Sequence, residues 1–302
     1  MRLATRLGLL ALAWTLHAQD STFSADVKVV NLLATVRDRD GKVVKDLTRD
    51  DFVIMDDGRP QAIRYFSQES NLPLAIGIMV DTSCSQIRVL ESERTASYKF
   101  LDQVLRADDV AFVMRFDFKV TLLQGFTSSR EELATAFSKI SRPKHCNTVL
   151  FDAIHDASEQ LMKGQGGRKA FVVLSDGGDV RSKNSIVAAI EFAQRADTII
   201  YSILFSNAQV LPRVLLFPPP VALVRGRNIM RRLARETGGG YFEVSKKKSI
   251  EQIYAEIEEE LRNQYSIGYT PDASGDQKFR KITLTAKRPD LVVRTREGYY
   301  PK

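Results

Sequence analysis

The sequence predicts an α/β fold: a doubly wound, mainly parallel sheet with one antiparallel edge hairpin, plus a small β subdomain formed from N- and C-terminal strands. Between residues 74 and 260, apolar runs of strand length alternate with longer helical stretches, which is typical of a parallel sheet covered by helices on both faces. The segments before 70 and after 264 have the Val-rich, partly alternating pattern of strands instead. Because the termini of a domain often lie close together, we expect these end segments to pack on each other.

The first residues, 1–18, read MRLATRLGLLALAWTLHA. Arg2 and Arg6 precede a short apolar stretch, and Ala18 is a small residue at a suitable cleavage position, as in a secretory signal peptide. The apolar stretch is too short to span a bilayer comfortably. We therefore expect an exported chain, secreted or periplasmic, that begins near Gln19 and has no transmembrane segment after cleavage.

The N-terminal β module is expected at 25–70. The stretch DVKVVNLLATVR (26–37) reads as a strand, and Asp40-Gly41 is a hairpin turn signal. Two more short strands are expected around Asp56-Asp57-Gly58. At the other end, residues 264–302 are expected to supply three strands, at 264–271, 278–287 and 291–300, that pack with this module.

The central domain is expected at 73–262. Its predicted strands are 74–80, 110–116, 119–123, 170–174, 198–205 and one within 238–244, and its predicted helices are 87–106, 129–140, 149–163, 183–195, 227–236 and 249–263. The strands 110–116 and 119–123 are too close for a crossover helix, so they must form a hairpin. Residues 207–228 contain Pro218-Pro219-Pro220, which favours an extended conformation; we expect a loop folded back on the domain, and its role stays open.

The charge pattern does not indicate a nucleic-acid-binding surface. The formal net charge is +7 and the pI is about 9.3, but the basic residues are spread out. The one dense run, Lys246-Lys247-Lys248, is soon followed by the acidic run at 256–260. The three histidines have no partner at metal-ligand spacing, so zinc is not predicted.

Small oxygen-bearing side chains follow several of the predicted strands. Sites in open α/β sheets form beyond the carboxyl ends of the strands, so we expect these residues to meet at one edge. Hydroxyl and carboxylate oxygens suit Mg²⁺, and mostly neutral ligands leave the ion in need of one more anion from outside. Read singly, the serines are also suited to cap a helix and the Asp after 170–174 to sit in a turn. The candidate metal residues are Asp81, Ser83, Ser85, Thr148 and Asp176.

This pattern resembles the metal-ion-dependent adhesion site of von Willebrand factor type A (VWA) domains, and the resemblance covers 73–262. Stretches such as FVIMDDGRPQAIRYFSQES, RKAFVVLSDGGD and ELRNQYSIGYTP extend it to the VWFA-related acidobacterial domain family over nearly the whole mature chain. The resemblance implies that Ser83, Ser85 and Thr148 contact the metal directly or nearly so. It also implies that Asp81 and Asp176 hold the metal's waters and the ligating hydroxyls. Mg²⁺ is the expected ion, with Mn²⁺ or Ca²⁺ as alternatives.

The chain departs from that pattern at position 84, which is usually small or flexible and here is Cys. Cys84 lies in the first metal loop, and Cys146 lies two residues before Thr148. If the loops converge on one ion, the two Cα atoms come within disulfide range, which is less than about 7 Å. A bridge between them, locking the metal loops, is our hypothesis; two unpaired cysteines are the alternative.

The predicted function is binding of a protein or cell-envelope ligand whose Asp or Glu completes the metal's coordination. One alternative is a structural or scaffold module whose metal only stabilises it. The other is a metal-dependent, phosphatase-like hydrolase, because Asp81 resembles the nucleophile position of aspartate-based phosphatases. Ser83 stands where those enzymes have a second Asp, which removes the acid–base group, and no G-x-S-x-G motif is present. An enzyme is therefore not predicted.

Overall fold

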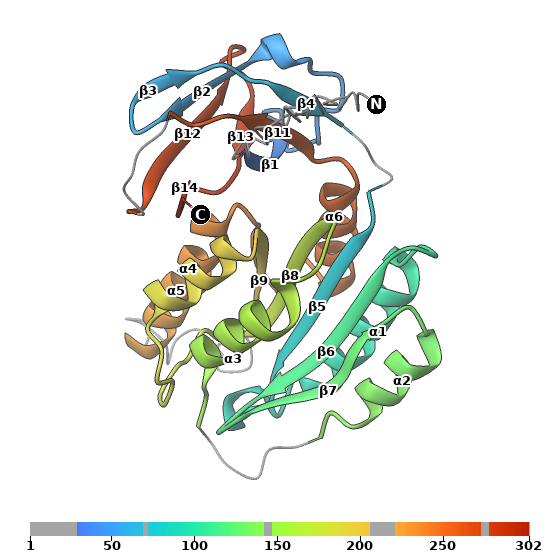
Figure 1. Cartoon of the computed structure of the whole chain (residues 1–302). Helices are drawn as coiled ribbons and strands as arrows, with labels where there is room; N and C mark the ends of the chain where they lie inside the picture. The colour runs from blue at the N-terminus through green and yellow to red at the C-terminus, as the bar shows by residue number, and fades with distance from the viewer. Residues whose placement is uncertain (1–28, 69–71, 142–146, 206–220, 273–277, 302) are drawn as a thin grey trace, which may run out of the picture.

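The computed structural model describes residues 29–68, 72–141, 147–205, 221–272 and 278–301 (Figure 1). A six-stranded sheet with the strand order β10-β9-β8-β5-β6-β7 forms its centre. All neighbouring pairs are parallel except β6 and β7, which form the antiparallel edge hairpin. The predicted fold class is thus confirmed. The strands are β5 (Leu74–Asp81), β6 (Val110–Phe116), β7 (Val120–Thr127), β8 (Arg168–Ser175), β9 (Thr198–Leu204) and β10 (Tyr241–Glu243).

The central strand β5 shows why this sequence forms a two-sided sheet. All eight of its residues are buried, and its side chains alternate between the two faces as a strand requires. Ile76 and Ile78 pack into the core on one face, whereas Met79 packs into the core on the other. Gly77 is required because a Cβ atom there would lie 2.2 Å from the ring of Phe112.

Helices cover both faces of this sheet (Figure 1). The helices α1, α2 and α6 bury apolar side chains in the core on one face, and α3, α4 and α5 do so on the other. Ser129, Ser185 and Ser249 cap α2, α4 and α6 by accepting a backbone N–H from the first turn. The helices are α1 (Leu90–Val104), α2 (Arg130–Ser138), α3 (Leu150–Ala157), α4 (Ile186–Arg195), α5 (Val221–Thr237) and α6 (Ile250–Arg262), with short helices η1 (Arg49–Asp51), η2 (Cys84–Gln86) and η3 (Ser158–Met162).

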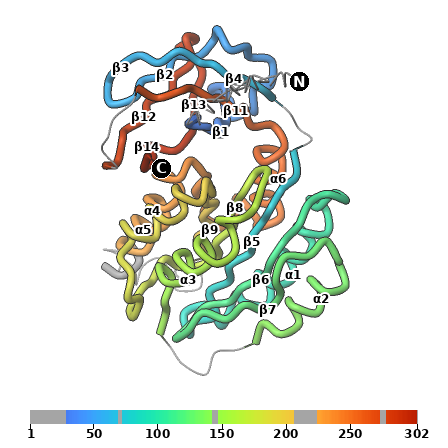
Figure 2. Tube along the Cα trace, in the orientation of Figure 1, coloured from blue at the N-terminus to red at the C-terminus, as the bar shows by residue number. Residues whose placement is uncertain are grey.

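The β subdomain consists of two four-stranded sheets, with the orders β13-β1-β11-β4 and β14-β12-β2-β3. Each sheet contains strands from both ends of the chain, and one apolar core lies between the sheets. Figure 2 shows these first and last described segments side by side. The strands are β1 (Val30–Arg37), β2 (Phe52–Asp56), β3 (Arg59–Gln61), β4 (Tyr65–Ser67), β11 (Tyr265–Tyr269), β12 (Arg280–Ala286), β13 (Val292–Arg294) and β14 (Gly298–Tyr299).

Several predicted elements have other bounds in the structure, and two of these differences matter here. The single strand expected at 291–300 is two short strands, β13 and β14, which pair in different sheets because the chain crosses from one sheet to the other between them. The helix expected at 227–236 begins earlier, at Val221, so the predicted loop 207–228 ends sooner. Its residues 206–220, like the predicted signal segment 1–18, lie outside the described residues. Within the described part of the chain, no helix has both the length and the apolar character of a membrane span.

Candidate metal site

Asp81 is the last residue of β5 and is completely buried. Its Oδ1 accepts a hydrogen bond from the backbone N–H of Ser83 at 2.9 Å, and its Oδ2 accepts one from the hydroxyl of Ser175 at 2.6 Å. Ser175 ends the neighbouring strand β8. The Asp81 carboxylate is therefore fixed from two strands, because parallel strands bring their carboxyl ends to the same edge.

The two serines of the first loop face each other. The hydroxyls of Ser83 and Ser85 share a hydrogen bond of 3.0 Å, so their oxygens converge as a shared ligand would require. Ser83 is buried and precedes η2, but its side chain makes no capping hydrogen bond there. The hydroxyl of Ser83 therefore does not serve as a helix cap.

Asp176 and Thr148 come from two other segments of the same edge. Asp176 follows β8, and its Oδ1 accepts a hydrogen bond from the N–H of Gly178 at 2.8 Å. Thr148 is buried, and its carbonyl accepts hydrogen bonds from the N–H groups of Val180 at 3.0 Å and Arg181 at 3.2 Å. The loop after β8 is thus joined to the Thr148 segment.

The same two segments are joined further by contacts that the sequence did not indicate. Asp179 accepts the N–H of Phe151 in the first turn of α3 at 3.0 Å and the hydroxyl of Ser182 at 2.6 Å. In return, Asp152 of α3 accepts the N–H groups of Lys183 and Asn184. Asp179 thus caps the start of α3, and Asp152 of α3 holds the loop that leads into α4.

Two carboxyl groups, those of Asp81 and Asp176, belong to the candidate site. Burial, and to a smaller extent the negative charge of Asp176, raise the pKa of Asp81 to about 7 against the opposing hydrogen bonds from Ser175 and Ser83. Neither Asp81 nor Asp176 forms an ion pair with a Lys, Arg or His of the described chain. Burying an ionised carboxylate without a cation carries a large desolvation free energy, and a bound divalent cation would offset it. The residues present therefore fit a metal ion.

Hydroxyl oxygens would have to contribute to that ion's shell. Among the described residues, no group of three or more His, Cys, Asp and Glu side chains is arranged to hold a metal ion. Ser83, Ser85 and Thr148 supply hydroxyls, which are hard oxygen ligands suited to Mg²⁺. Which of the candidate residues bind the ion directly stays a prediction.

Sequence reasoning missed a third carboxyl group, that of Glu93 in α1. Its side chain is fully buried, and neither of its oxygens has a hydrogen-bond partner among the described residues. Burial first, and then the charges of Asp81 and Asp176, raise the pKa of Glu93 well above its usual value. The helical period offered a signal, because Glu93 lies three residues after Leu90 and seven before Phe100, on the buried face of α1.

The structure describes only one of the two cysteines of the predicted disulfide. Cys84 begins η2 and is not a free thiol. Cys146, its predicted partner, lies outside the described residues. The bridge between the two metal loops therefore stays a prediction.

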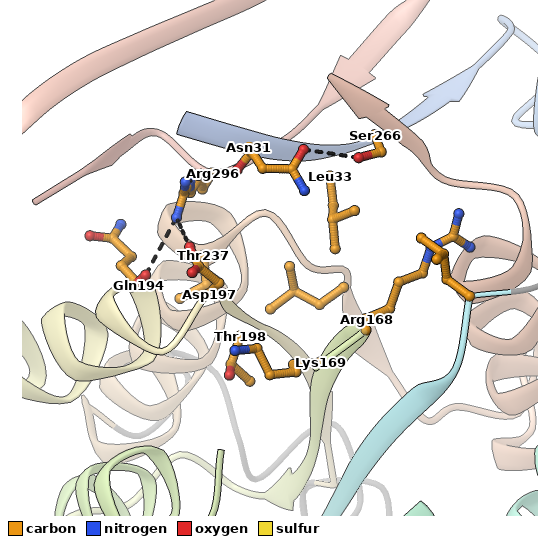
Figure 3. A pocket seen from close by; sticks show the side chains of 13 residues that line it. Asn31, Leu33, Arg168, Lys169, Gln194, Asp197, Thr198, Thr237, Ser266 and Arg296 are labelled. Carbon is orange, nitrogen blue, oxygen red and sulfur yellow. Dashed lines mark hydrogen bonds and ion pairs between the residues drawn. The ribbon is translucent and has the colours of Figure 1, made fainter. Parts of the chain in front are cut away.

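A separate cavity of about 330 Å³ lies at the opposite edge of the sheet, against the β subdomain (Figure 3). Arg296 lies at one side of it and donates to the carboxylate of Asp197 at 2.9 Å and to the backbone carbonyl of Asn31 at 2.8 Å. Asn31 also accepts a hydrogen bond from the hydroxyl of Ser266 at 2.9 Å. None of the predicted metal residues lines this cavity, which belongs to the joint between the two parts of the molecule.

Comparison with known proteins gives the fold. No protein-family model matches the chain, and no curated protein matches it. Among solved structures, proximal thread matrix protein 1 from the mussel byssus is similar, with a TM-score of 0.50 at 12% identity over 68% of this chain and 51% of that one. A structure of the same mussel protein with a zinc-occupied MIDAS motif has a TM-score of 0.50 at 13% identity, over 70% of this chain and 50% of that chain. This chain thus spans about half of the mussel protein's length.

A less similar structure, the VWA domain of SpRpn10, has a TM-score of 0.42 at 14% identity over 63% of this chain and 94% of that one. Sequence identities this low show a similar fold and nothing about function. The strand order, the helices on both faces and the similarity to the mussel protein agree. The chain has a von Willebrand factor type A-like fold.

Proposed function

We propose that this protein binds a protein or cell-envelope ligand through a divalent cation. The cation is held at the carboxyl edge of the sheet by the hydroxyls of Ser83, Ser85 and Thr148, and Asp81 and Asp176 orient its waters. The observation that carries this proposal is a buried Asp81 carboxylate, without a described cationic partner, beside two converging serine hydroxyls.

The donor set explains why such an ion takes a ligand from outside. Mg²⁺ prefers six oxygens in an octahedron and keeps several waters when few carboxylates bind it directly. Hydroxyls and waters leave most of its charge uncompensated, so an acidic side chain from a partner is a favourable last ligand. Mn²⁺ and Ca²⁺ are the alternative ions.

Binding is favoured over hydrolysis by the state of Asp81. A nucleophilic carboxylate needs a free oxygen facing the substrate, whereas both oxygens of Asp81 accept hydrogen bonds inside the protein and the residue has no exposed surface. The proposed site of action is outside the cytoplasm, supported by the signal-like pattern of residues 1–18.

The first test is calorimetric titration of the chelator-treated protein with Mg²⁺ and Mn²⁺. We expect binding to the wild type, and at least about tenfold weaker binding to Asp81→Asn and Ser83→Ala. Ser202→Ala is the matched control, because Ser202 is also a fully buried serine at the sheet, its hydroxyl has no hydrogen-bond partner among the described residues, and it lies outside the site. Absence of metal binding to the folded wild type would sink the proposal.

The second test separates ligand binding from a purely stabilising metal. The wild type and Ser83→Ala are used to capture partners from the envelope of the source cell, with and without chelator. We expect capture that is lost with chelator and with Ser83→Ala. The scaffold alternative would be favoured if the wild type binds Mg²⁺ in the first test but captures the same partners in the presence of chelator, and if Ser83→Ala captures them too.

A further inference from the structure

A groove of about 750 Å³ opens beside the metal edge. One wall is the turn between β6 and β7, and the other is formed by the start of α3 and the loop at 181–184. The groove includes Asn147 and Val149, the two neighbours of Thr148, so it lies directly next to the candidate metal site. Its lining residues used below are Phe118, Lys119, Asp152, Asp156, Arg181 and Lys183.

Both walls are tied to the metal loops. On one side, the Thr82 N–H donates to the carbonyl of Phe116 at 2.9 Å, and the Thr82 hydroxyl donates to Asp117 at 3.2 Å. Thr82 lies between Asp81 and Ser83. On the other side, the N–H of Arg181 donates to the carbonyl of Thr148. The groove therefore has a fixed position relative to the loops that carry the candidate metal residues.

The rim of the groove carries three exposed cations, Lys119, Arg181 and Lys183. None of them forms an ion pair with a carboxylate in the part of the chain that the structure describes. The carboxylate of Asp152 accepts backbone N–H groups of the loop instead, and Asp156 contacts His155. The ammonium of Lys119 lies 5.7 Å from the centroid of the Phe118 ring, and the charge of Lys183 helps to lower the pKa of Asp152. Exposed cations that form no ion pair are still suited to an anionic ligand.

We propose that this groove receives an extended acidic segment of the partner protein. This rests on the proposed function: one carboxylate of the segment completes the metal, and neighbouring carboxylates reach Lys119, Arg181 and Lys183. The ring of Phe118 lies at the groove and is 41% exposed. It offers apolar contact to the methylene groups of the segment's acidic side chains. The groove thus selects segments with several acidic residues over a lone Asp or Glu.

A protein segment fits the charge balance better than a nucleic acid. The three cations face two carboxylates in the groove, those of Asp152 and Asp156. A phosphate backbone, with a charge on every nucleotide, needs a more continuous basic surface. Acidic side chains spaced along a peptide match a few separate cations.

The test uses two synthetic glycine–serine peptides of equal length, one with a single Asp and one with several Asp and Glu residues around it. Binding to the Mg²⁺-loaded protein is followed by NMR chemical shifts of the labelled protein. We expect the multiply acidic peptide to bind about tenfold more tightly to the wild type, because each exposed ion pair contributes a little. The combined variant Lys119→Ser, Arg181→Ser, Lys183→Ser should lose that preference and bind both peptides alike.

The matched control is Lys42→Ser, Arg59→Ser, Lys281→Ser, which removes the same charge from exposed positions of the β subdomain that also form no described ion pair. It should keep the wild-type preference. Equal binding of both peptides to the wild type, or an unchanged preference in the groove variant, would overturn the groove proposal while metal-dependent binding stands. Peptide binding that ignores chelator would instead overturn the proposed function. Displacement of the acidic peptide by a single-stranded oligonucleotide at equal concentration would also contradict an acidic-segment site.

Discussion

At the scale of single residues, the buried acids decide the character of the site. Asp81 is held by a backbone N–H and by the Ser175 hydroxyl rather than by a cation. Glu93 lies fully buried near enough to Asp81 and Asp176 for their charges to raise its pKa. Such a group is tolerated in the metal-free fold when it keeps its proton, and neutralisation is the usual outcome for an unpaired buried carboxyl.

Glu93 makes the stability of the metal-free protein depend on pH. Its folded-state pKa is raised, so its contribution is fully present below its unfolded value near 4.5 and is lost as pH rises through the folded value. Glu93→Gln cannot ionise, so its stability should fall less than that of the wild type between pH 5 and 8. The difference should grow by up to about 1.4 kcal/mol for each pH unit inside that window. Urea unfolding in chelator at both pH values measures it.

Glu91→Gln is the control for this prediction, because Glu91 lies on the same helix but is exposed and paired with Arg94. Its pH dependence should match the wild type. A Glu93→Gln protein that loses as much stability as the wild type from pH 5 to 8 would show that Glu93 does not titrate in this window.

At the scale of elements, the loop after β8 is positioned by its close approach to α5. Gly177 has a φ of 77°, and a Cβ atom there would lie 2.2 Å from the carbonyl oxygen of Gly226. A Cβ atom on Gly226 would in turn lie 2.1 Å from the carbonyl oxygen of Asp176. Two glycines are needed because backbone packs against backbone at this point.

Gly226→Ala should displace the Asp176 loop and weaken metal binding by about tenfold, a typical effect of disturbing groups that support a metal site. The same change should favour the helix itself by about 1 kcal/mol, because Ala is the better helix former. A loss of metal affinity would therefore come from the loop and not from a melted helix. Calorimetric Mg²⁺ titration, with circular dichroism for helix content, checks this.

The control is Gly125→Ala in β7, where a new Cβ atom meets nothing within 4 Å. It should leave metal affinity unchanged. If Gly226→Ala binds Mg²⁺ as tightly as Gly125→Ala, the contact with α5 does not position Asp176.

At the scale of the whole molecule, Glu260 joins the central domain to the β subdomain. This residue of α6 has a fully buried side chain and pairs with Arg37 of β1 at 2.6 Å and with Arg294 of β13. Nearby, the guanidinium of Arg168 in β8 donates to the carbonyls of Leu261 and Gln264. These contacts link strands from both ends of the chain to one helix end.

Glu260→Ala should lower the free energy of unfolding by about 2–3 kcal/mol, because it removes charge-assisted hydrogen bonds to two partly buried arginines. Its neighbour Glu259 is 44% exposed and, among the described residues, forms one ion pair, with Lys45 at 3.3 Å, so Glu259→Ala should lower the free energy of unfolding by less than about 1 kcal/mol. Urea unfolding of both variants provides the comparison. Equal costs would mean that the joint does not depend on Glu260.

The order of strands and helices was predictable because each element has its own local pattern of apolar and polar residues. The buried strand β5, the close spacing of β6 and β7 and the hydroxyl pair Ser83 and Ser85 all follow from residues near one another in the chain. Because sites form beyond the carboxyl ends of parallel strands, Asp176, which follows β8, could be predicted at the same edge as Asp81. The prediction for Thr148 came from its position directly before a predicted helix. The bounds of the predicted domains and the identity of the metal ligands stay predictions.

Long-range contacts decided the rest. The division of 291–300 between two sheets, the contact of Asp179 with α3, the burial of Glu93 beside Asp81 and the groove next to Thr148 all depend on segments far apart in sequence. Local pattern records which face of an element is apolar, but it does not record what packs against that face. The sequence by itself therefore determined the alternating α/β order and the kind of oxygen donors, whereas the tertiary structure decided which charges share one buried edge.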